Sequence, residues 1–404
     1  MTARAVTASA VRVGVLPTLP YHAGLSMQVY AAGVMESLAG VPGIDATLLT
    51  PPFAVGPRPG RVRSRWIRHV TYPAWAAEQP ADVYHVVDHG NAQLLRRLPH
   101  ERTVVTCHDL YPLALATGRL RVPGAASRIS MLPTALRLRG LRRARLVLTV
   151  SEHTRGECRR YLGIPDERLR VVHESVAAAA WSPCDEPAVA ATQARLGLGP
   201  DTLTVLHVGS NDPRKNLGAV CRVVARLRAR TGRAVRLVKV GAPFGAAERE
   251  LLDRAGLPAG IVREAGRVSP EELVRVYHAA TALLYPSYYE GFCRPVVEAM
   301  AAGLPVVAAR AGAIPEVTGG AAALHAPDDI EGMAERLVAI AGDHRLRHQM
   351  SEAGRAVSRR FAGADHGRVL ADVYREVYRD AGGAAAGATA MRTGAPAARG
   401  ETGE

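Results

Sequence analysis

The sequence predicts an α/β protein in which two Rossmann-like, doubly wound domains face a central cleft. Three observations lead to this fold class. Strand-like apolar runs alternate with amphipathic helical segments along most of the chain, which is the pattern of βαβ units. Most of these runs are continuously apolar, as expected for strands covered on both faces of a parallel sheet. The length of 404 residues is enough for two buried cores.

The strand-like runs form two groups that are separated by a break in the pattern. They include 11–17, 82–87, 103–109 and 145–151 before the break, and 203–210, 234–241, 282–287 and 304–309 after it. The break at 181–202 has several prolines and no clear period, which predicts a domain boundary. In a later helical segment, Ser269 is the expected N-cap, Pro270 the first helical residue and Glu272 the capping-box partner.

These features divide the chain into six parts. We expect a flexible N-terminal arm (1–10), an N-terminal domain (11–185), a linker (186–200), a C-terminal domain (201–363), a C-terminal helix (364–381) and a disordered tail (382–404). The arm has no long apolar core before a small-residue cleavage site, so it does not resemble a signal peptide. The tail is rich in glycine and alanine, a low-complexity composition that cannot build a core.

The cysteine pattern limits the classes of site and compartment. The five cysteines are scattered and include no C-x-x-C pair, which argues against a disulfide framework and against a zinc site. No uncharged apolar run reaches the roughly 18 residues of a membrane-spanning helix. The expected location is therefore the cytoplasm.

The chain is strongly basic, with a formal net charge of +14. Of its 51 basic residues, all but Lys215 and Lys239 are arginines, and a compositional bias of the genome would explain that skew. The functional interpretation is an acidic partner, either nucleotide phosphates or the anionic inner face of the plasma membrane, which the protein would contact peripherally. Nucleic acid is not an expected partner, because no nucleic-acid-binding motif is present.

The stretch "YYEGFCRPVVEAMAAGLPVV" (288–307) places Glu290 in a loop after a strand and Glu298 in the first turn of a helix that starts near Pro295. Two such carboxylates can reach separate parts of a sugar nucleotide: one accepts from the ribose diol and the other from sugar hydroxyls. The diphosphate between them favours N–H groups at a helix N-terminus. Gly291 would let the backbone approach closely. The alternative is a solvated loop charge plus a carboxylate that complements the helix dipole.

The stretch "HVGSNDPRKNLGAV" (207–220) places two cations at a strand-to-helix junction. The strand ends at Gly209, and Arg214, Lys215 and the N-cap candidate Asn216 open the next helix. Cations at such a junction suit a diphosphate leaving group. The alternative is a solvated pair in a loop.

Polar residues also follow strands of the N-terminal half. His108 and Asp109 lie at the end of one strand, where they could touch a substrate; the alternative for His108 is a local hydrogen bond. Gly24 precedes a long helix whose N-terminus could face the phosphates, a weak signal by itself.

The segment "DVYHVVDHGNA" (82–92) adds three further candidates, Asp88, His89 and Asn91. The sequence contains no H-E-x-x-H motif and no D-x-D triplet. We therefore expect acceptor-side or structural roles for these residues, and no metal ion.

Taken together, these residues resemble family 4 of the retaining glycosyltransferases, which have the two-Rossmann fold called GT-B. The stretch "EGFCRPVVEAMAAGLPVVAARAGAIPEV" resembles the E-x7-E signature of that family and the segment after it, and "VGSNDPRKN" resembles its phosphate-binding Arg-Lys pair. "TCHDLYPL", "VLTVSEHTRGECRRYLGIPDERLRVV" and "GRVSPEELVRVYHAA" resemble further segments, the last one near the nucleotide base. The similarity covers roughly residues 11–380, with the motifs in family order.

The resemblance implies a set of site residues. The implied donor-binding set is Gly24, Gly209, Arg214, Lys215, Glu290, Gly291, Phe292, Cys293 and Glu298. The implied catalytic set is Arg214, Lys215, His108 and Glu290; the acceptor-side candidates Asp88, His89, Asn91 and Asp109 come from their positions after strands. The N-terminal domain would hold the acceptor, the C-terminal domain would bind the nucleotide sugar, and the C-terminal helix would cross back to the N-terminal domain.

The resemblance also implies the role of each group. Glu298 would hold the ribose hydroxyls and Glu290 the hydroxyls of the donor sugar. Arg214 and Lys215 would stabilise the charge of the departing nucleoside diphosphate, and His108 would contact the donor sugar near its reacting face. The reaction would be front-face transfer of a hexose, mannose or glucose, with retained configuration and without a metal or other cofactor. The acceptor would be a cell-envelope polysaccharide, a glycolipid or a small metabolite.

Two departures from the family pattern are visible. Cys293 stands where the family usually has glycine, which leaves the identity of the sugar open, and "HAGLS" replaces a commoner double glycine in the N-terminal domain. Two alternative functions remain open. One is a non-catalytic relative that binds nucleotides or anionic surfaces, and the other is a sugar-nucleotide epimerase on the same fold.

Overall fold

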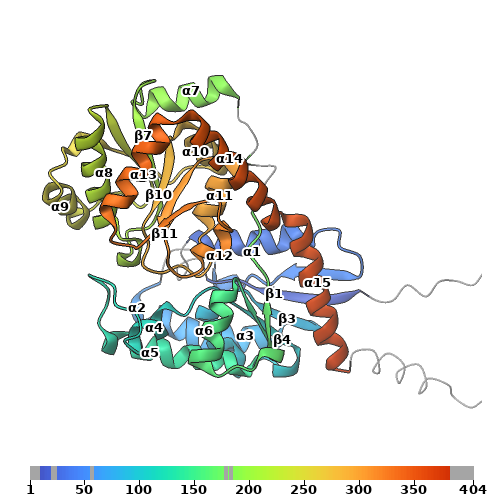
Figure 1. Cartoon of the computed structure of the whole chain (residues 1–404). Coiled ribbons are helices and arrows are strands. Elements are labelled where there is room, and N and C mark those ends of the chain that lie inside the picture. Colours follow the sequence, from blue (N-terminus) through green and yellow to red (C-terminus); the bar gives the residue numbers. More distant parts are fainter. Residues whose placement is uncertain (1–9, 20–24, 55–58, 177–180, 182–184, 383–404) are drawn as a thin grey trace, which may run out of the picture.

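The computed structural model describes residues 10–19, 25–54, 59–176, 181 and 185–382. Two α/β domains lie one above the other, each with a parallel six-stranded sheet and surrounding helices (Figure 1). The prediction of two doubly wound domains is confirmed. Among the described residues, no helix is both long enough and apolar enough to span a bilayer.

The N-terminal sheet has the strand order β2-β1-β3-β4-β5-β6. Its strands are β1 (Val11–Leu16), β2 (Ile44–Leu48), β3 (Val83–Val86), β4 (Thr103–Cys107), β5 (Leu146–Thr149) and β6 (Leu169–Val171). All its pairs are parallel; Val13, for example, lies opposite Ala46 in β2 and Val83 in β3. The direction of winding reverses between β1 and β3.

The C-terminal sheet has the strand order β12-β11-β10-β7-β8-β9. Its strands are β7 (Leu203–Gly209), β8 (Val235–Gly241), β9 (Val262–Gly266), β10 (Ala282–Tyr285), β11 (Val306–Ala309) and β12 (Ala323–His325). The winding reverses between β7 and β10, so a ligand crevice is expected at the carboxyl ends of these two strands.

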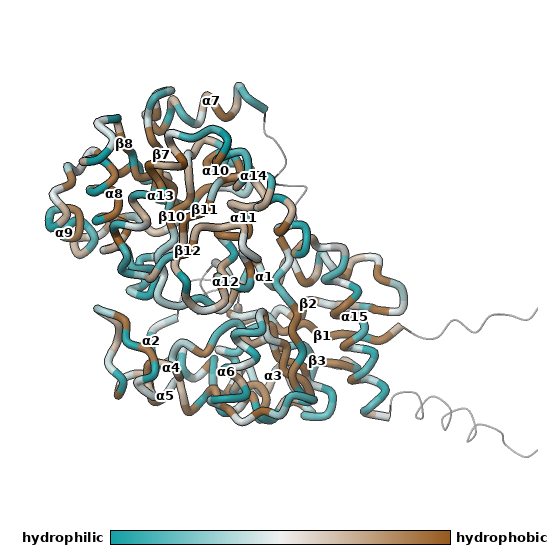
Figure 2. The backbone as a smooth tube through the Cα atoms, viewed as in Figure 1, coloured by the Kyte–Doolittle hydropathy of each residue, from teal (hydrophilic) through white to brown (hydrophobic). Residues whose placement is uncertain are grey.

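All the strand-like runs named from the sequence form inner strands of the two sheets, and the four edge strands were not predicted. β2, β6, β9 and β12 are short and mostly half-exposed or exposed. The inner strands are mainly hydrophobic along the backbone trace (Figure 2). An edge strand is covered less completely, so its sequence does not have to be a continuous apolar run.

Helices pack around both sheets (Figure 1). The α-helices are α1 (Leu25–Leu38), α2 (Arg61–Trp66), α3 (Tyr72–Glu78), α4 (Tyr111–Ala116), α5 (Arg128–Leu138), α6 (Glu152–Leu162), α7 (Glu186–Arg195), α8 (Leu217–Thr231), α9 (Ala246–Arg254), α10 (Pro270–Ala279), α11 (Arg294–Ala302), α12 (Ile314–Thr318), α13 (Ile330–Gly342), α14 (His344–Ser358) and α15 (Gly363–Asp380). Shorter 3-10 turns are η1 (Pro52–Ala54), η3 (His89–Arg96), η4 (His100–Arg102), η5 (Arg139–Arg143), η6 (Asp166–Arg168), η8 (Pro213–Lys215), η9 (Ala259–Ile261) and η10 (Arg359–Phe361), and η2 (Ile67–Thr71) is a π-helical turn. The predicted N-cap at Ser269 is confirmed, since its hydroxyl accepts the backbone N–H of Glu272.

The segment 186–200 was expected to be a linker, and the structure corrects this. It forms α7, and Leu196 and Leu198 just after that helix are buried in the core of the C-terminal domain. Arg195 pairs with Glu272 of α10. The segment lacks a clear apolar period because, besides the partly buried Val189, mainly its last turn and the residues after it contact the core.

The C-terminal helix α15 returns to the N-terminal domain. Leu370, Val373 and Tyr374 are buried in the same core as β1 and α1, and the Tyr374 hydroxyl lies 2.8 Å from His85 Nδ1 in β3. A Cβ at Gly367 would come within 1.8 Å of the Ser37 carbonyl oxygen, so glycine allows α15 to contact α1 closely. The expected arm and tail lie outside the described residues, except for their innermost residues 10 and 382.

Candidate active site

Contacts between the domains bring predicted site residues together after the strands of both sheets: Arg214 pairs with Asp109, and Gly291 lies against the backbone of His108. Arg214 and Lys215 lie in η8, directly after β7, and Glu290 lies in the loop after β10. These are the two strands between which the winding of the C-terminal sheet reverses. The topology therefore brings together two motifs that are some 75 residues apart in the chain.

Lys215 and Glu290 form a buried ion pair at this point. The Lys215 ammonium donates to Glu290 Oε1 at 2.7 Å and to the Tyr285 hydroxyl at 2.7 Å. Lys215 and Glu290 are only 8% and 5% exposed. A lysine ammonium has three protons, so one remains for a ligand. Within the described structure, Glu290 Oε2 accepts no hydrogen bond and is free to receive a hydroxyl group.

Asn216 fixes the loop that presents Lys215. It adopts the left-handed conformation (φ 54°) and caps α8 by accepting the backbone N–H of Ala219, which confirms the predicted N-cap. Its amide also donates to the carbonyl oxygens of Pro286, at 3.1 Å, and Pro327, at 2.9 Å. Asparagine is one of the few non-glycine residues that adopt this conformation readily, so the turn and its neighbours are held by one side chain.

Arg214 spans the two domains. Its guanidinium donates to Asp109 Oδ2 at 3.2 Å and lies over the ring of Tyr111. Burial opposes the charge of Arg214, but the neighbouring carboxylates, Asp109 first, outweigh it and raise the pKa of Arg214. Burial likewise opposes ionisation of Asp109, yet the charge of Arg214 lowers the pKa of Asp109. Both groups are therefore ionised at neutral pH.

Glu298 is buried and lies in the second turn of α11, because that helix begins at Arg294; the prediction of the first turn was wrong. The Tyr277 hydroxyl donates to Glu298 Oε2 and Arg294 Nε donates to Oε1, both at 2.9 Å. An ionised carboxylate offers about four lone-pair directions. Each oxygen of Glu298 therefore retains acceptor capacity for a ligand hydroxyl.

Gly291 contacts the backbone of the other domain. A Cβ at this position would lie 1.8 Å from the carbonyl oxygen of His108, and the Ser151 hydroxyl donates to the Gly291 carbonyl at 2.6 Å. The backbone of Gly291 therefore contacts the N-terminal domain, and its expected approach to the donor stays a prediction. The side chain of the next residue, Phe292, is buried in the C-terminal core.

Cys293 occupies a backbone position that favours glycine. It is the N-cap of α11 with φ 79°, and its side chain makes no capping hydrogen bond. L-residues are strained in this region, which gives a physical reason for the glycine usual in the family. The thiol is 4% exposed, and burial, with the charge of Glu290, raises its pKa.

Both ring nitrogens of His108 are bound by protein groups. Nδ1 lies 3.0 Å from Glu174 Oε1, and Nε2 lies 2.8 Å from the Val87 carbonyl oxygen. Burial opposes protonation, but the hydrogen bond and charge of Glu174 outweigh it and raise the pKa of His108. Because both partners are acceptors, the ring is best described as imidazolium. Its predicted contact with a donor sugar stays a prediction, and a ring nitrogen would reach the sugar only if one of these bonds opened.

The acceptor-side candidates form a buried polar cluster at the winding reversal of the N-terminal sheet. Asp88 accepts from the Thr18 hydroxyl at 2.5 Å, and Asn91 donates to the same hydroxyl at 3.1 Å. His89 Nδ1 accepts the backbone N–H of His108 at 3.2 Å, which places the ring proton on Nε2. Burial lowers the pKa of His89, so this ring is neutral.

Two further predicted positions are Gly24 and Gly209. Gly24 lies outside the described residues. Gly209 ends β7, and its carbonyl accepts from the ammonium of Lys239 at 2.6 Å; that ammonium also donates to the carbonyls of Val240 and Ala242. Burial lowers the pKa of Lys239 to about 8. Lys239 thus holds the ends of two strands together, whereas Lys215 faces the site.

Two family profiles match the chain, one in each domain. The sequence profile "Glycosyl transferases group 1" matches residues 202–343, and "Glycosyltransferase Family 4" matches residues 22–179. The two matches cover both domains in the order expected. The chain belongs to glycosyltransferase family 4.

Relatives and solved structures agree with this family. The chain is 27% identical to the O-antigen chain mannosyltransferase B of Escherichia coli over 73% of its own length and 74% of the relative. It is 34% identical to a D-inositol 3-phosphate glycosyltransferase of Nocardioides over 52% of its own length, but spans only 48% of that relative. The sucrose-phosphate synthase of Thermosynechococcus elongatus has the same fold, with a TM-score of 0.70, 21% identity and coverage of 91% and 99%. Anabaena HepE, solved in complex with UDP-glucose, has a TM-score of 0.70 at 17% identity, with coverage of 91% and 100%.

The structure of this glycosyltransferase adds site residues that the sequence analysis missed. Arg294 lies four residues before Glu298 on one helix, and that spacing could have indicated the pair. Tyr285 lies inside the predicted strand 282–287 and is the last residue of β10, at the carboxyl edge of the sheet, which is also a readable signal. Tyr277 lies in the stretch 266–280 that resembles a family segment near the nucleotide base, but no pattern singled it out, because it is a buried position of α10 that reaches Glu298 through helix packing.

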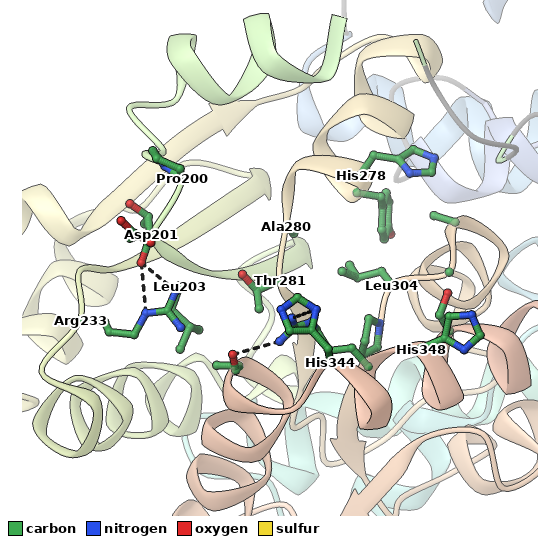
Figure 3. A pocket seen from close by; sticks show the side chains of 18 of the residues that line it. Pro200, Asp201, Leu203, Arg233, His278, Ala280, Thr281, Leu304, His344 and His348 are labelled. Atoms are coloured by element: carbon green, nitrogen blue, oxygen red, sulfur yellow. Dashed lines mark hydrogen bonds between the residues drawn. The ribbon is translucent and has the colours of Figure 1, made fainter. Parts of the chain in front are cut away.

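A cavity of about 730 Å³ lies at the opposite, amino edge of the C-terminal sheet (Figure 3). It is lined by several basic side chains, but its arginines donate hydrogen bonds to backbone carbonyl oxygens. Arg233 points toward Asp201 and donates to its carbonyl oxygen at 3.0 Å, and Arg347 donates to the carbonyl of Ile340 near the end of α13. None of the predicted site residues lines this cavity. The candidate site at the carboxyl edge is therefore separate from this cavity.

Proposed function

We propose that this glycosyltransferase moves a hexose, mannose or glucose, from a nucleoside diphosphate sugar to an acceptor hydroxyl with retained configuration. The observation that carries the proposal is the buried Lys215–Glu290 pair, with Arg214 beside it, at the winding reversal of the C-terminal sheet. A diphosphate joined to a sugar requires cations next to hydrogen-bond acceptors, and this pair supplies both within a few ångströms.

The nucleoside end of the donor would lie against α11. Glu298 retains lone pairs on both oxygens for the vicinal diol of a ribose, and Arg294 and Tyr277 hold the carboxylate in place. The N-terminus of α11 carries no side-chain cap, so its backbone N–H groups can face a phosphate. The segment from Glu290 to Glu298 would then extend along the donor, from its sugar to its ribose.

The diphosphate would lie between Arg214 and Lys215. Lys215 has a third proton available, and Arg214 would exchange its bond to Asp109 for one to a phosphate oxygen. Binding therefore couples the donor to the contact between domains. Glu290 would accept from sugar hydroxyls through Oε2 while Lys215 neutralises its charge.

The transfer step would be a front-face substitution. The bond between the anomeric carbon and the diphosphate oxygen breaks, and its electron pair stays with the leaving diphosphate. The acceptor oxygen bonds to the same face of that carbon, and its proton passes to the leaving phosphate oxygen. Arg214 and Lys215 stabilise the growing negative charge, and positioning supplies the rest of the rate. No metal is needed in this scheme, because the two side chains supply the positive charge.

The substrate class is proposed from the named relatives and a fold neighbour. One relative is named as a mannosyltransferase, others as inositol phosphate glycosyltransferases, and a fold neighbour was solved with UDP-glucose. We propose a hexose donor and an acceptor from cell-envelope polysaccharide, glycolipid or small-metabolite glycosylation. Nucleotide sugars of this kind would place the enzyme in the cytoplasm.

The test combines binding, turnover and stereochemistry. Calorimetric titration with UDP, GDP and ADP should identify one preferred nucleotide. A panel of sugars on that nucleotide, scored by released nucleoside diphosphate, should identify the donor, and NMR of the product should show the anomeric configuration of the donor. EDTA should leave turnover unchanged.

Each contrary outcome points to a different function. Nucleotide binding without any release of diphosphate would indicate a non-catalytic binder. Interconversion of free sugar nucleotides without an acceptor would indicate an epimerase. A crystal with a nucleoside diphosphate bound far from Lys215 and Glu298 would contradict the proposed site itself.

A further inference from the structure

Exposed apolar side chains gather on two helices of the N-terminal domain. Nine large apolar side chains are exposed among the described residues, and six of them belong to the helical stretch 61–71 (α2 and η2) or to α5: Val62, Trp66, Val70, Ile129, Leu132 and Leu136. Their spacing of three or four residues puts each trio on one face of its helix. These six side chains and the arginines of 61–71 and 128–139 are called the α2–α5 surface below.

The exposed apolar side chains do not belong to a loosely packed part of the hydrophobic core. The opposite face of each helix is buried, with Ile67 and Tyr72 on the first and Ala135 and Leu138 on the second. By contrast, Val62, Trp66 and Ile129 are 84%, 63% and 78% exposed. Single exposed apolar residues are ordinary, but a group this concentrated marks a docking surface.

The charge of the surface has one sign. The stretch 61–71 has four arginines, the stretch 128–139 has three, and neither contains an aspartate or a glutamate. Within the described structure, Arg61, Arg63 and Arg65 form no ion pair. Burial and then the charge of Arg68 lower the pKa of Arg137 to about 10, so arginines of the two helices lie close enough to repel each other. The two stretches therefore contain no counter-charge of their own, and the carboxylate whose charge acts on Arg68 and Arg137 is Asp88 of the polar cluster.

The surface is connected to the acceptor side of the site. Arg68 donates to the carbonyl oxygen of Gly90 at 2.6 Å, between the candidates His89 and Asn91. The hydroxyl of Tyr72, in the continuation of the same helix, donates to the Pro17 carbonyl at 2.6 Å, next to Thr18 of the polar cluster. A ligand that binds the α2–α5 surface would thus lie beside the acceptor half of the cleft.

We propose that the α2–α5 surface docks the glycosyltransferase on an anionic lipid bilayer and presents the acceptor side of the cleft to a lipid-borne acceptor; the second clause rests on the proposed function. Apolar side chains with a tryptophan at their centre insert at the boundary between headgroups and acyl chains, and the surrounding arginines bind anionic headgroups. A second copy of the chain fits less well, because a two-fold contact would oppose two arginine-rich surfaces.

The first experiment measures binding to lipid vesicles by sedimentation. The full-length enzyme should bind vesicles of phosphatidylcholine with 30–40% phosphatidylglycerol, a composition chosen for the test, and should bind much less to phosphatidylcholine alone. The triple variant Val62→Ser/Trp66→Ser/Val70→Ser should bind at least about tenfold less tightly. Val369→Ser, an exposed valine on α15, is the matched control and should bind like the wild type.

The second experiment tests the charge. Arg63→Gln and Arg65→Gln should each weaken vesicle binding about fivefold, and added salt should reduce that difference. Arg336→Gln, an exposed arginine of α13 in the other domain, should have no effect. Circular dichroism and binding of the nucleoside diphosphate should be unchanged in all these variants, since none lies in the donor site.

The outcomes separate this proposal from the proposed function. Equal vesicle binding by the wild type and the triple variant, or no binding of the wild type at low salt, would overturn it whatever the transfer activity. If the triple variant instead changed the molar mass in light scattering, the surface would be an interface between proteins and the proposal would be wrong. If the wild type did not bind a nucleoside diphosphate, that result would contradict only the proposed function.

Discussion

The donor and acceptor halves of the site hold their polar groups in different ways. In the C-terminal domain, Lys215 and Glu290 are partners of each other within one sheet edge. In the N-terminal domain, Asp109 forms an ion pair with Arg214 of the other domain, and the carbonyl of His108 contacts Gly291 there. The Lys215–Glu290 pair is therefore formed within one domain, whereas the Arg214–Asp109 pair and the Gly291–His108 contact depend on how the domains meet.

This difference indicates how the enzyme can open without losing its donor site. Separation of the domains would break the Arg214–Asp109 pair and expose two charges to water, which costs little at a surface. It would leave the Lys215–Glu290 pair buried and intact. Domain motion would thus act mainly on Arg214 and Asp109.

The largest effect is expected from breaking the donor half. Lys215→Met should lower kcat by about 10²–10³, as for loss of an oxyanion donor, and should lower the unfolding free energy by about 3–5 kcal/mol because Glu290 is left buried and unpaired. The double variant Lys215→Met/Glu290→Gln should recover most of the stability but none of the turnover. Steady-state kinetics and denaturant unfolding would show this; recovery of turnover in the double variant would contradict a role of Lys215 in catalysis.

A smaller effect is expected from weakening the ribose contact. Glu298→Gln keeps an acceptor for Tyr277 but removes the charge that strengthens hydrogen bonds to hydroxyls. The KM for the donor should rise at least about tenfold, with less change in kcat, since a hydrogen bond to a charged group contributes about 1.5–3 kcal/mol. Kinetics with the identified donor provide the measurement. An unchanged KM would mean that Glu298 does not hold the ribose.

The contact between domains should also depend on pH through Glu157. Burial, opposed in part by the hydrogen bond from the Tyr289 hydroxyl, raises the pKa of Glu157 from 4.5 to about 7. The folded protein then binds this proton more tightly than the unfolded chain. The stabilisation is complete below about pH 4.5 and is lost as the pH rises through about 7.

Glu157→Gln should remove that part of the pH dependence. Denaturant unfolding at pH 5 and pH 8 should show a smaller loss of stability in the variant than in the wild type. Glu152→Gln, an exposed carboxylate at the start of the same helix, should behave like the wild type. The same slope in all three proteins would show that Glu157 has an ordinary pKa.

The smallest effect is expected at Cys293. Glycine would relieve the strain at φ 79°, worth about 1 kcal/mol, and would remove a side chain next to Glu290. Stability should change by about 1 kcal/mol or less, and the ratio of kcat/KM between two sugars on one nucleotide should change by up to about tenfold. The donor panel repeated with Cys293→Gly is the measurement, and an identical preference would place the thiol outside the sugar pocket.

Much of the fold and half of the site followed from the sequence. The inner strands were readable because burial on both faces requires continuous apolar runs. Lys215, Glu290 and Glu298 were readable because their motifs sit at strand ends and helix starts, where local chain geometry already fixes the position of a side chain. The order of these motifs then indicated the family.

The tertiary structure alone decided the rest. The edge strands and α7 contact the core over one side or a few residues, so their sequences carry little period. Arg214 and Asp109 are 105 positions apart. Whether their side chains meet depends on how the two separately folded domains dock. For the same reason the sequence could not tell that His108 gives both ring nitrogens to protein acceptors: hydrogen-bond partners are set by three-dimensional proximity, which no local pattern encodes.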